Sequence, residues 1–125
     1  VRDLLPRAQA VAPSLVHLDY WSGNVLWDGD RIAAVVDWEE AAYGDPSIDV
    51  AYCRMDMVLA GRDRAAEVFL EAYRAEAGQP VANLGLWELA AAARPMTDPE
   101  GWLAEPGVRE RLGQFIAGAM RRACH

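Results

Sequence analysis

The first half of the chain carries four polar side chains whose types and spacing could do chemistry together. His17 and Asp19 lie two residues apart, Asn24 follows five residues later, and Asp37 comes after an apolar run. Carboxylate and amide oxygens are hard ligands and proton acceptors, and proteins hold Mg²⁺ with one or two carboxylates together with substrate phosphates. A zinc centre would need more His or Cys. These residues therefore favour phosphoryl transfer over zinc chemistry.

Two apolar runs are expected to pair as a β-hairpin that positions the metal-binding side chains. Residues 25–27 form one run, and residues 32–36 form the other, which is rich in β-branched side chains. Between them, Asp28, Gly29 and Asp30 are a strong turn signal, because glycine accepts a positive φ without steric cost. Asp28 and Asp30 are therefore interpreted as turn residues and not as ligands.

The returning strand should bring Asp37 to the open end of this hairpin. A loop of about two or three residues at Gly29 would place Asp37 opposite Trp21 or Ser22. Asn24 would project from the same end. Neighbouring strands lie about 4.8 Å apart, so the side chains of Asn24 and Asp37 could reach one cation.

The order of these residues resembles a known set of motifs. Residues 17–24, with the pattern H-x-D-x-x-x-x-N, are followed by Asp37, and this resembles the catalytic loop and metal-binding Asp of the protein-kinase-like fold. The residues within these motifs resemble more closely those of the aminoglycoside phosphotransferase and choline kinase-like family. Residues 36–39 resemble the metal-binding strand end of that family, and residues 44–51 resemble the helix start that follows it.

The resemblance implies a role for each matching residue. Asp19 would be the catalytic base that orients the acceptor hydroxyl. Asn24 and Asp37 would bind the nucleotide by holding Mg²⁺ on the phosphates of ATP, the co-substrate. His17 would brace the loop, and Asp49 would accept hydrogen bonds from the loop backbone. One position departs from the pattern: residue 18 is Leu where the family more often has Gly, so the backbone conformation there is an open question.

Several of these residues also have a purely structural interpretation. His17 could be an ordinary core histidine, and Asp49 could simply favour the positive N-terminus of a helix. Asp45 before Pro46 is typical of a helix N-cap followed by proline at the first helical position. Glu39 could touch the metal site or belong to a solvated pair of carboxylates.

Composition indicates a single globular domain, residues 1–125, and excludes some classes of partner. Hydrophobic residues make up 53% and charged residues 25% of the chain, which is ordinary for a folded protein. The net charge of −7 argues against a nucleic-acid partner, and no apolar run is long enough for a membrane span. The same charge would suit a cationic small-molecule acceptor, although it would also suit plain solubility, which is the commoner reason for such a charge. Two cysteines, Cys53 and Cys124, make no disulfide framework, so a reducing, cytoplasmic location is expected, with Cys53 buried.

Amphipathic patterns predict helices in most of the remaining chain. Asn83 is expected to cap the third of the later helices and Pro95 to stop it, and a single helical turn could follow Asp98. The helices are predicted over residues 1–12, 46–59, 63–77, 83–93 and 108–122. The predicted fold is α+β and mostly α-helical: the C-terminal lobe of the protein-kinase-like fold, with a catalytic loop (15–24), one hairpin carrying the metal site (25–37) and a helical subdomain (46–123).

The second lobe of a kinase-like enzyme is expected to be absent from this sequence. That lobe supplies a glycine-rich cover and a lysine for the phosphates, whereas this chain has no G-x-G-x-x-G and all twelve of its basic residues are arginine. The first hypothesis is therefore an ATP-dependent phosphotransferase acting on a hydroxyl of a small molecule, incomplete and inactive as this chain alone. Its nucleotide face would be covered by the missing N-terminal lobe or by a second copy.

Two alternatives and the choice of acceptor stay open. The chain could be a stand-alone binding module that kept the lobe and lost catalysis. It could also be a metal-dependent hydrolase, although Asn24 would then have no role. Residues after the metal site could select the acceptor or could simply lie on the surface: Asp56, Glu88, Asp98 and Trp102.

Overall fold

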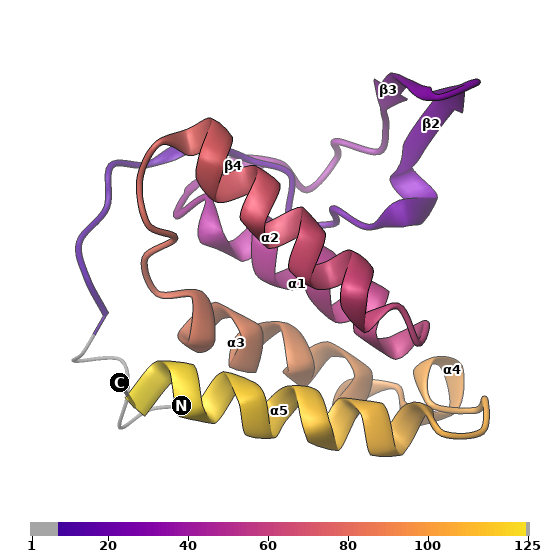
Figure 1. The fold of residues 1–125 in the computed structure, drawn as a ribbon. Coiled ribbons are helices and arrows are strands. Elements are labelled where there is room, and N and C mark those ends of the chain that lie inside the picture. The colour runs from indigo at the N-terminus through magenta and orange to yellow at the C-terminus, as the bar shows by residue number, and fades with distance from the viewer. Residues whose placement is uncertain (1–7, 125) are drawn as a thin grey trace.

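The computed structural model describes residues 8–124 and is mostly helical with two small sheets, an α+β fold as predicted. In Figure 1, α3 and α5 run side by side beneath α1 and α2, and the β2–β3 hairpin projects from the helical body. The elements are β1 (Ser14–Val16), a 3₁₀ turn η2 (Ser22–Asn24), β2 (Val25–Asp28), β3 (Arg31–Val35), β4 (Ala42–Gly44), α1 (Ser47–Leu59), α2 (Asp63–Ala77), α3 (Leu84–Thr97), α4 (Pro99–Trp102) and α5 (Val108–Cys124).

The sheet content differs from the prediction of a single hairpin. The hairpin of β2 and β3 is present, with Gly29 at positive φ in its turn. A second antiparallel pair, β1 with β4, aligns Leu15 with Tyr43. Each of these strands has only three residues, which is too short to show an alternating apolar pattern. Their pairing is set by the chain between them and not by a local signal.

A β-bulge changes the expected register of the hairpin. Asp28 pairs with Arg31 and Trp27 with Ile32, but Leu26 pairs with Ala34, so one extra residue lies on β3. Extending the regular turn-end register would place Asp37 opposite Ser22. The bulge shifts the pairing by one residue, and the Val36 N–H then donates to the Asn24 carbonyl at 2.9 Å. The predicted partners of Asp37, Trp21 or Ser22, were therefore wrong.

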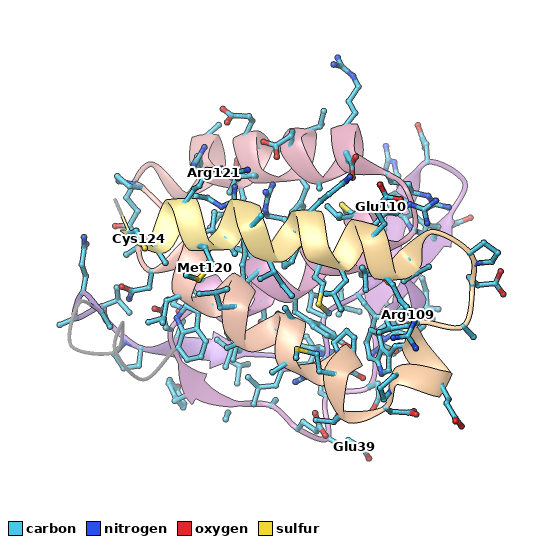
Figure 2. The ribbon with its side chains drawn as sticks, turned by 90° about the horizontal axis from the view of Figure 1, so that it is seen from below. Glu39, Arg109, Glu110, Met120, Arg121 and Cys124 are labelled. Atoms are coloured by element: carbon cyan, nitrogen blue, oxygen red, sulfur yellow. The ribbon has the colours of Figure 1, made fainter. Side chains whose placement is uncertain are left out.

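The core lies where α1 packs against α2, α3 and α5. Met55 of α1 is fully buried, and Phe115 and Leu112 of α5 pack in the same cluster. Figure 2 looks onto α5, whose exposed face carries Arg109, Glu110, Met120, Arg121 and Cys124. None of the helices within residues 8–124 combines the length and the apolar character that crossing a membrane would require.

Two helix predictions need correction. Residues 8–12 of the predicted first helix are not helical, and residues 1–7 lie outside the described part of the chain. The helix predicted to stop before Pro95 continues to Thr97. Proline removes one N–H from the ladder, but Pro95 lies in the last turns of α3, where its ring is fully buried and packing offsets the lost bond.

The helix predicted over residues 63–77 ends as expected, and Asp98 begins the predicted helical turn, whereas Asn83 does not act as a cap. Gly78 ends α2 in the left-handed conformation (φ 66°), and the Asp98 side chain caps the short α4 by accepting from the Gly101 N–H. Asn83 is itself left-handed (φ 60°) and makes no capping bond to α3. Its side chain instead bonds the backbone of Gln9 and the carboxylate of Asp45.

A buried ion network ties four helices together. Glu88 of α3 is completely buried, and its two carboxylate oxygens pair with Arg54 of α1 at 2.9 Å and Arg122 of α5 at 2.5 Å. Arg54 also pairs with Glu67 of α2 and donates to the Ala66 carbonyl. Glu88 therefore belongs to the packing of the helices, and neither the acceptor-selecting nor the surface interpretation of this residue was right.

Candidate functional site

The segment from His17 to Asn24 connects β1 to the hairpin and is held by the first turn of α1. The Asp49 carboxylate accepts hydrogen bonds from the backbone N–H of His17 at 2.7 Å and of Leu18 at 2.9 Å. Asp49 lies in the first turn of α1, where a negative charge is also favoured by the helix dipole. The two interpretations given for Asp49, a loop brace and a helix-terminus charge, are compatible in this geometry.

Two more side chains of α1 contact the same segment. Tyr52 donates its hydroxyl hydrogen to Asp19 Oδ1 at 3.2 Å, and Asp56 accepts from both the N–H and the hydroxyl of Ser22. Asp49, Tyr52 and Asp56 are spaced at i, i+3 and i+7, so they lie on one face of the helix. Along this face, each of the three side chains bonds a different part of the loop. The spacing could have identified Tyr52 from the sequence.

His17 links the loop to the end of the hairpin. Its ring is buried, Nε2 lies 2.7 Å from the Val36 carbonyl, and Nδ1 accepts from the Asp19 N–H at 3.1 Å. A carbonyl oxygen only accepts, so Nε2 carries the hydrogen that points to Val36. The Trp38 ring lies against the imidazole, with ring centroids 4.6 Å apart.

Leu18 has the left-handed conformation, with φ of 70°. This is the position where the resembling family more often has Gly, and a left-handed backbone costs a non-glycine residue about 1–2 kcal/mol. The structure therefore answers the question raised by this departure: the backbone takes a glycine-like conformation although the side chain is Leu. Hydrogen bonds on both sides of Leu18 hold it there.

Asn24 brings Asp19 to the mouth of the hairpin. Asn24 is buried, and its Nδ2 donates to the Asp19 carbonyl at 2.9 Å and to Asp19 Oδ2 at 3.1 Å. Asp37 follows the paired strand, is exposed and has φ of 64°, a conformation that Asp tolerates better than most residues. Within residues 8–124, the Asp37 carboxylate makes no hydrogen bond or ion pair, so its oxygens are available to a ligand.

The oxygen atoms of Asn24 and Asp37 suit Mg²⁺ that is shared with a substrate, and they are too few to hold a metal ion by themselves. Asn24 uses its amide nitrogen on Asp19, which leaves its amide oxygen for a cation. In the part of the chain that the structure describes, no three His, Cys, Asp or Glu residues group as a metal site. A cation bound by Asn24 and Asp37 would need further ligands, and substrate phosphates are the usual source for Mg²⁺.

Sequence reasoning missed Arg94, which reaches the loop from the last turn of α3. Its guanidinium lies over the Tyr52 ring, 4.3 Å from the centroid, and Nη2 donates to the Leu18 carbonyl. Nη1 lies 3.8 Å from Asp19 Oδ1. Burial raises the pKa of the Tyr52 phenol, and the nearby Asp19 adds to this while Arg94 opposes it, so Tyr52 stays protonated and can donate. No local signal connects residues this far apart in sequence.

The other residues named as possible acceptor-selecting residues differ in how they contact the loop. Asp56 bonds Ser22 and stands closest to it. Trp102 is half-buried against the core, with its ring 6.4 Å from that of Tyr52. Asp98 is occupied as the cap of α4. Among these candidates, Asp56 therefore contacts the loop directly, and Trp102 lies near Tyr52, which bonds Asp19.

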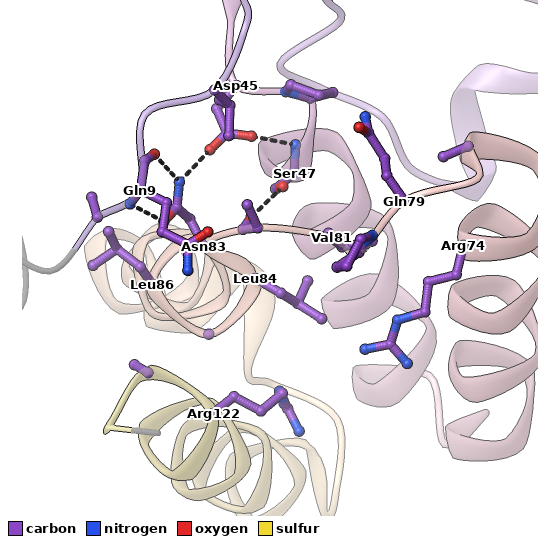
Figure 3. Close-up of a pocket in the computed structure, with 18 of the residues that line it drawn as sticks. Gln9, Asp45, Ser47, Arg74, Gln79, Val81, Asn83, Leu84, Leu86 and Arg122 are labelled. Atoms are coloured by element: carbon purple, nitrogen blue, oxygen red, sulfur yellow. Dashed lines mark hydrogen bonds between the residues drawn. The ribbon is translucent and has the colours of Figure 1, made fainter.

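A large cavity lies away from the loop. It has a volume of about 810 Å³, and neither His17, Asp19, Asn24 nor Asp37 lines it. Figure 3 shows the hydrogen-bonded group around Asp45 at one side of this cavity and Arg74 and Arg122 at the other. Size alone does not mark it as the reaction centre, because the polar groups that suit phosphoryl transfer lie elsewhere.

Comparison with known proteins assigns the family. The model of the phosphotransferase enzyme family matches residues 1–84, about two thirds of the chain. The chain belongs to this family. The match covers the loop, the hairpin, α1 and α2, which are the elements that carry the candidate site.

Two relatives share part of the sequence. Hygromycin-B 4-O-kinase of Escherichia coli is 57% identical over 37 residues, which is 30% of this chain and 11% of the relative. The 4-hydroxytryptamine kinase of Psilocybe cyanescens is 28% identical over 94 residues, which is 65% of this chain and 26% of the relative. The chain thus spans about a quarter or less of these relatives. No solved structure matches it.

Proposed function

We propose that this chain is the C-terminal lobe of a phosphotransferase that moves the γ-phosphoryl group of ATP to a hydroxyl of a small molecule. The observation that carries the proposal is the pair of bonds from Asn24 Nδ2 to the carbonyl and carboxylate of Asp19, with Asp37 on the neighbouring strand end. These bonds hold the proposed base beside one proposed metal ligand, and family membership supports the proposal.

Asp19 would act as the base. A carboxylate has about four lone-pair sites, and Tyr52 and Asn24 use one each, so Asp19 can still accept a hydrogen bond from an acceptor hydroxyl. As the hydroxyl oxygen bonds to phosphorus and the bond to the β-phosphate oxygen breaks, Asp19 takes the hydroxyl proton and ADP leaves. Asn24 and Asp37 would hold Mg²⁺, which when bound neutralises charge on the transferring phosphates.

Exposed apolar side chains on the hairpin support a covering lobe. Leu26 is 48% exposed, Trp27 61% and Ile32 54%. The hairpin projects from the helical body (Figure 1). Leu26 and Trp27 are neighbours on β2, and successive side chains of a strand point to opposite faces, so each face of the hairpin carries an exposed apolar side chain. A two-stranded hairpin is marginally stable by itself in water. A nucleotide-binding lobe packed on the hairpin would bury these side chains, whereas a stand-alone module should present a polar face there or cover it with a partner or a second copy.

The acceptor is proposed to be a hydroxylated and cationic small molecule. The names of both relatives describe kinases of small molecules. The net charge of −7 favours the approach of a cation. Asp56, exposed in part beside Ser22, is the residue after the metal site that best fits contact with such an acceptor.

Two measurements test these proposals. The intact mass of the natural protein tests the lobe assignment: a mass near 13.7 kDa would contradict it, and a clearly larger mass is expected. ATP turnover by the protein at its natural length, against a panel of hydroxylated amines, tests the activity. Asp19→Asn should lower the rate by about 100-fold or more, since general-base catalysis contributes 10²–10⁴-fold. Asp63→Asn, at the exposed start of α2, is the matched control.

A further inference from the structure

The peptide group between Leu18 and Asp19 is held at both ends. Its carbonyl oxygen accepts a hydrogen bond from Arg94 Nη2, and its N–H donates to His17 Nδ1. The preceding peptide is also fixed, because the Leu18 N–H donates to Asp49. A left-handed Leu persists only when its surroundings determine the backbone on both sides. Arg94 restrains the carbonyl side of Leu18. This restraint fixes the position of the Asp19 Cα, from which the side chain extends.

The guanidinium of Arg94 is itself held in place. It stacks on the Tyr52 ring at 4.3 Å, and the same Tyr52 donates to Asp19 Oδ1. Arginine suits this place because its planar fork can stack on an aromatic face and still direct N–H groups at its edge. The Arg94 side chain is 38% exposed, so it is reachable from solvent and is not part of the closed core.

We propose that Arg94 is a positioning residue for Asp19. It fixes the Leu18 carbonyl and, through Tyr52, the carboxylate of Asp19, so the base is oriented before the acceptor arrives. This inference rests on the proposed function, in which Asp19 accepts the acceptor proton. In this scheme Arg94 contacts neither the acceptor nor the phosphates; it acts through the loop backbone, through Tyr52 and through its ion pair with Asp19 Oδ1 at 3.8 Å.

Kinetics of Arg94 variants test this role in the protein at its natural length. Arg94→Ala should lower kcat by about 10- to 100-fold and change KM for ATP and acceptor by less than about threefold, since misplacing a reacting group by about 1 Å can cost 10²-fold. Millimolar guanidinium should restore part of the rate to Arg94→Ala. The kcat of Arg94→Lys should lie between those of the wild type and Arg94→Ala, because lysine keeps the charge but lacks the planar guanidinium. Arg74→Ala removes an exposed arginine paired with Glu71 and should leave the rate unchanged.

Amide hydrogen exchange of residues 15–24 gives a readout that does not depend on activity. Exchange in this segment should accelerate in Arg94→Ala and stay at the wild-type rate in Arg74→Ala. Unchanged exchange together with unchanged kcat in Arg94→Ala would overturn the positioning role. If Asp19→Asn keeps the wild-type rate, the proposed function fails instead, and the exchange measurement still decides whether Arg94 holds the loop.

Discussion

Asp49 accepts hydrogen bonds from the consecutive N–H groups of His17 and Leu18, at 2.7 and 2.9 Å, across about thirty residues of intervening chain. Replacing it with Asn should destabilise the protein by about 2–3 kcal/mol, because the amide loses the charge and one accepting oxygen, and hydrogen bonds to charged groups are worth 1.5–3 kcal/mol. Urea unfolding measures the loss. Asp63→Asn is the control: Asp63 also lies in the first turn of its helix, but it is exposed. Equal losses for the two variants would contradict a specific role for Asp49.

The left-handed backbone of Leu18 predicts an unusual order of substitutions. Leu18→Gly should change the free energy of unfolding by less than about 1 kcal/mol, because relief of strain offsets the greater freedom of glycine in the unfolded chain. Leu18→Val should be less stable than Leu18→Gly by about 1 kcal/mol or more, since a β-branched residue fits positive φ poorly. Chemical denaturation of both variants checks the order. A valine variant as stable as the glycine variant would mean that the φ of 70° is not maintained.

Local signals allowed much of the fold to be predicted from the sequence. The turn at Gly29, the end of α2 at Gly78 and the amphipathic α5 each depend on residues close together in the chain, and all three were predicted correctly. The pairing of β1 with β4 was missed because it joins distant residues with no pattern of their own. The helix continuing through Pro95 was missed because burial outweighed local preference.

The residues of the candidate site also fall into two groups: those that local spacing in the sequence predicts, and those that depend on contacts between distant parts of the chain. The spacing of His17, Asp19 and Asn24 in one loop was visible in the sequence, and the structure places them in contact. Tyr52 could have been found from its helical spacing to Asp49. Arg94 could not, because its contact with Leu18 spans 76 residues and depends on how α3 packs against α1.

The completely buried Glu88 makes a strong prediction about stability. Glu88→Ala leaves Arg54 buried with only the exposed Glu67 as a charged partner, so the protein should lose about 3–5 kcal/mol, as expected for breaking a buried pair. Glu71→Ala removes the partner of Arg74 in an exposed pair and should cost no more than about 0.5 kcal/mol. Thermal and urea unfolding compare the two variants. A small loss for Glu88→Ala would show that the helices can repack around the free arginine.

Asp45 should make stability depend on acid pH. Burial alone would raise the pKa of its carboxyl, but hydrogen bonds from Asn83, Ser47 and Trp87 outweigh burial and lower the pKa below its usual value. A carboxyl whose pKa is lower in the folded than in the unfolded state stabilises the protein at pH values above its unfolded-state pKa. This stabilisation is lost as pH falls through the folded-state pKa.

Asp45→Asn should therefore cost about 1–2 kcal/mol at neutral pH, allowing for partial exposure of the carboxylate. The difference from wild type should shrink below about pH 3.8, the ordinary pKa of Asp. Urea unfolding across this range measures it, with Asp30→Asn in the exposed turn as a control. A difference that stays constant with pH would argue against the charged form as the source of the stability.

The two cysteines should differ in reactivity. Burial raises the pKa of the Cys53 thiol to about 12, with Asp56 and Asp49 adding to the effect, whereas Cys124 is exposed at the end of α5. The thiolate is the nucleophile, so at about pH 8 Cys53 should form it roughly a thousand-fold less than a thiol with the model value of 9.0. A thiol-reactive disulfide reagent should therefore label one cysteine in the native protein and two in denaturant. Cys124→Ser should abolish the native labelling; rapid labelling of that variant would mean that α1 opens at its contact with the loop.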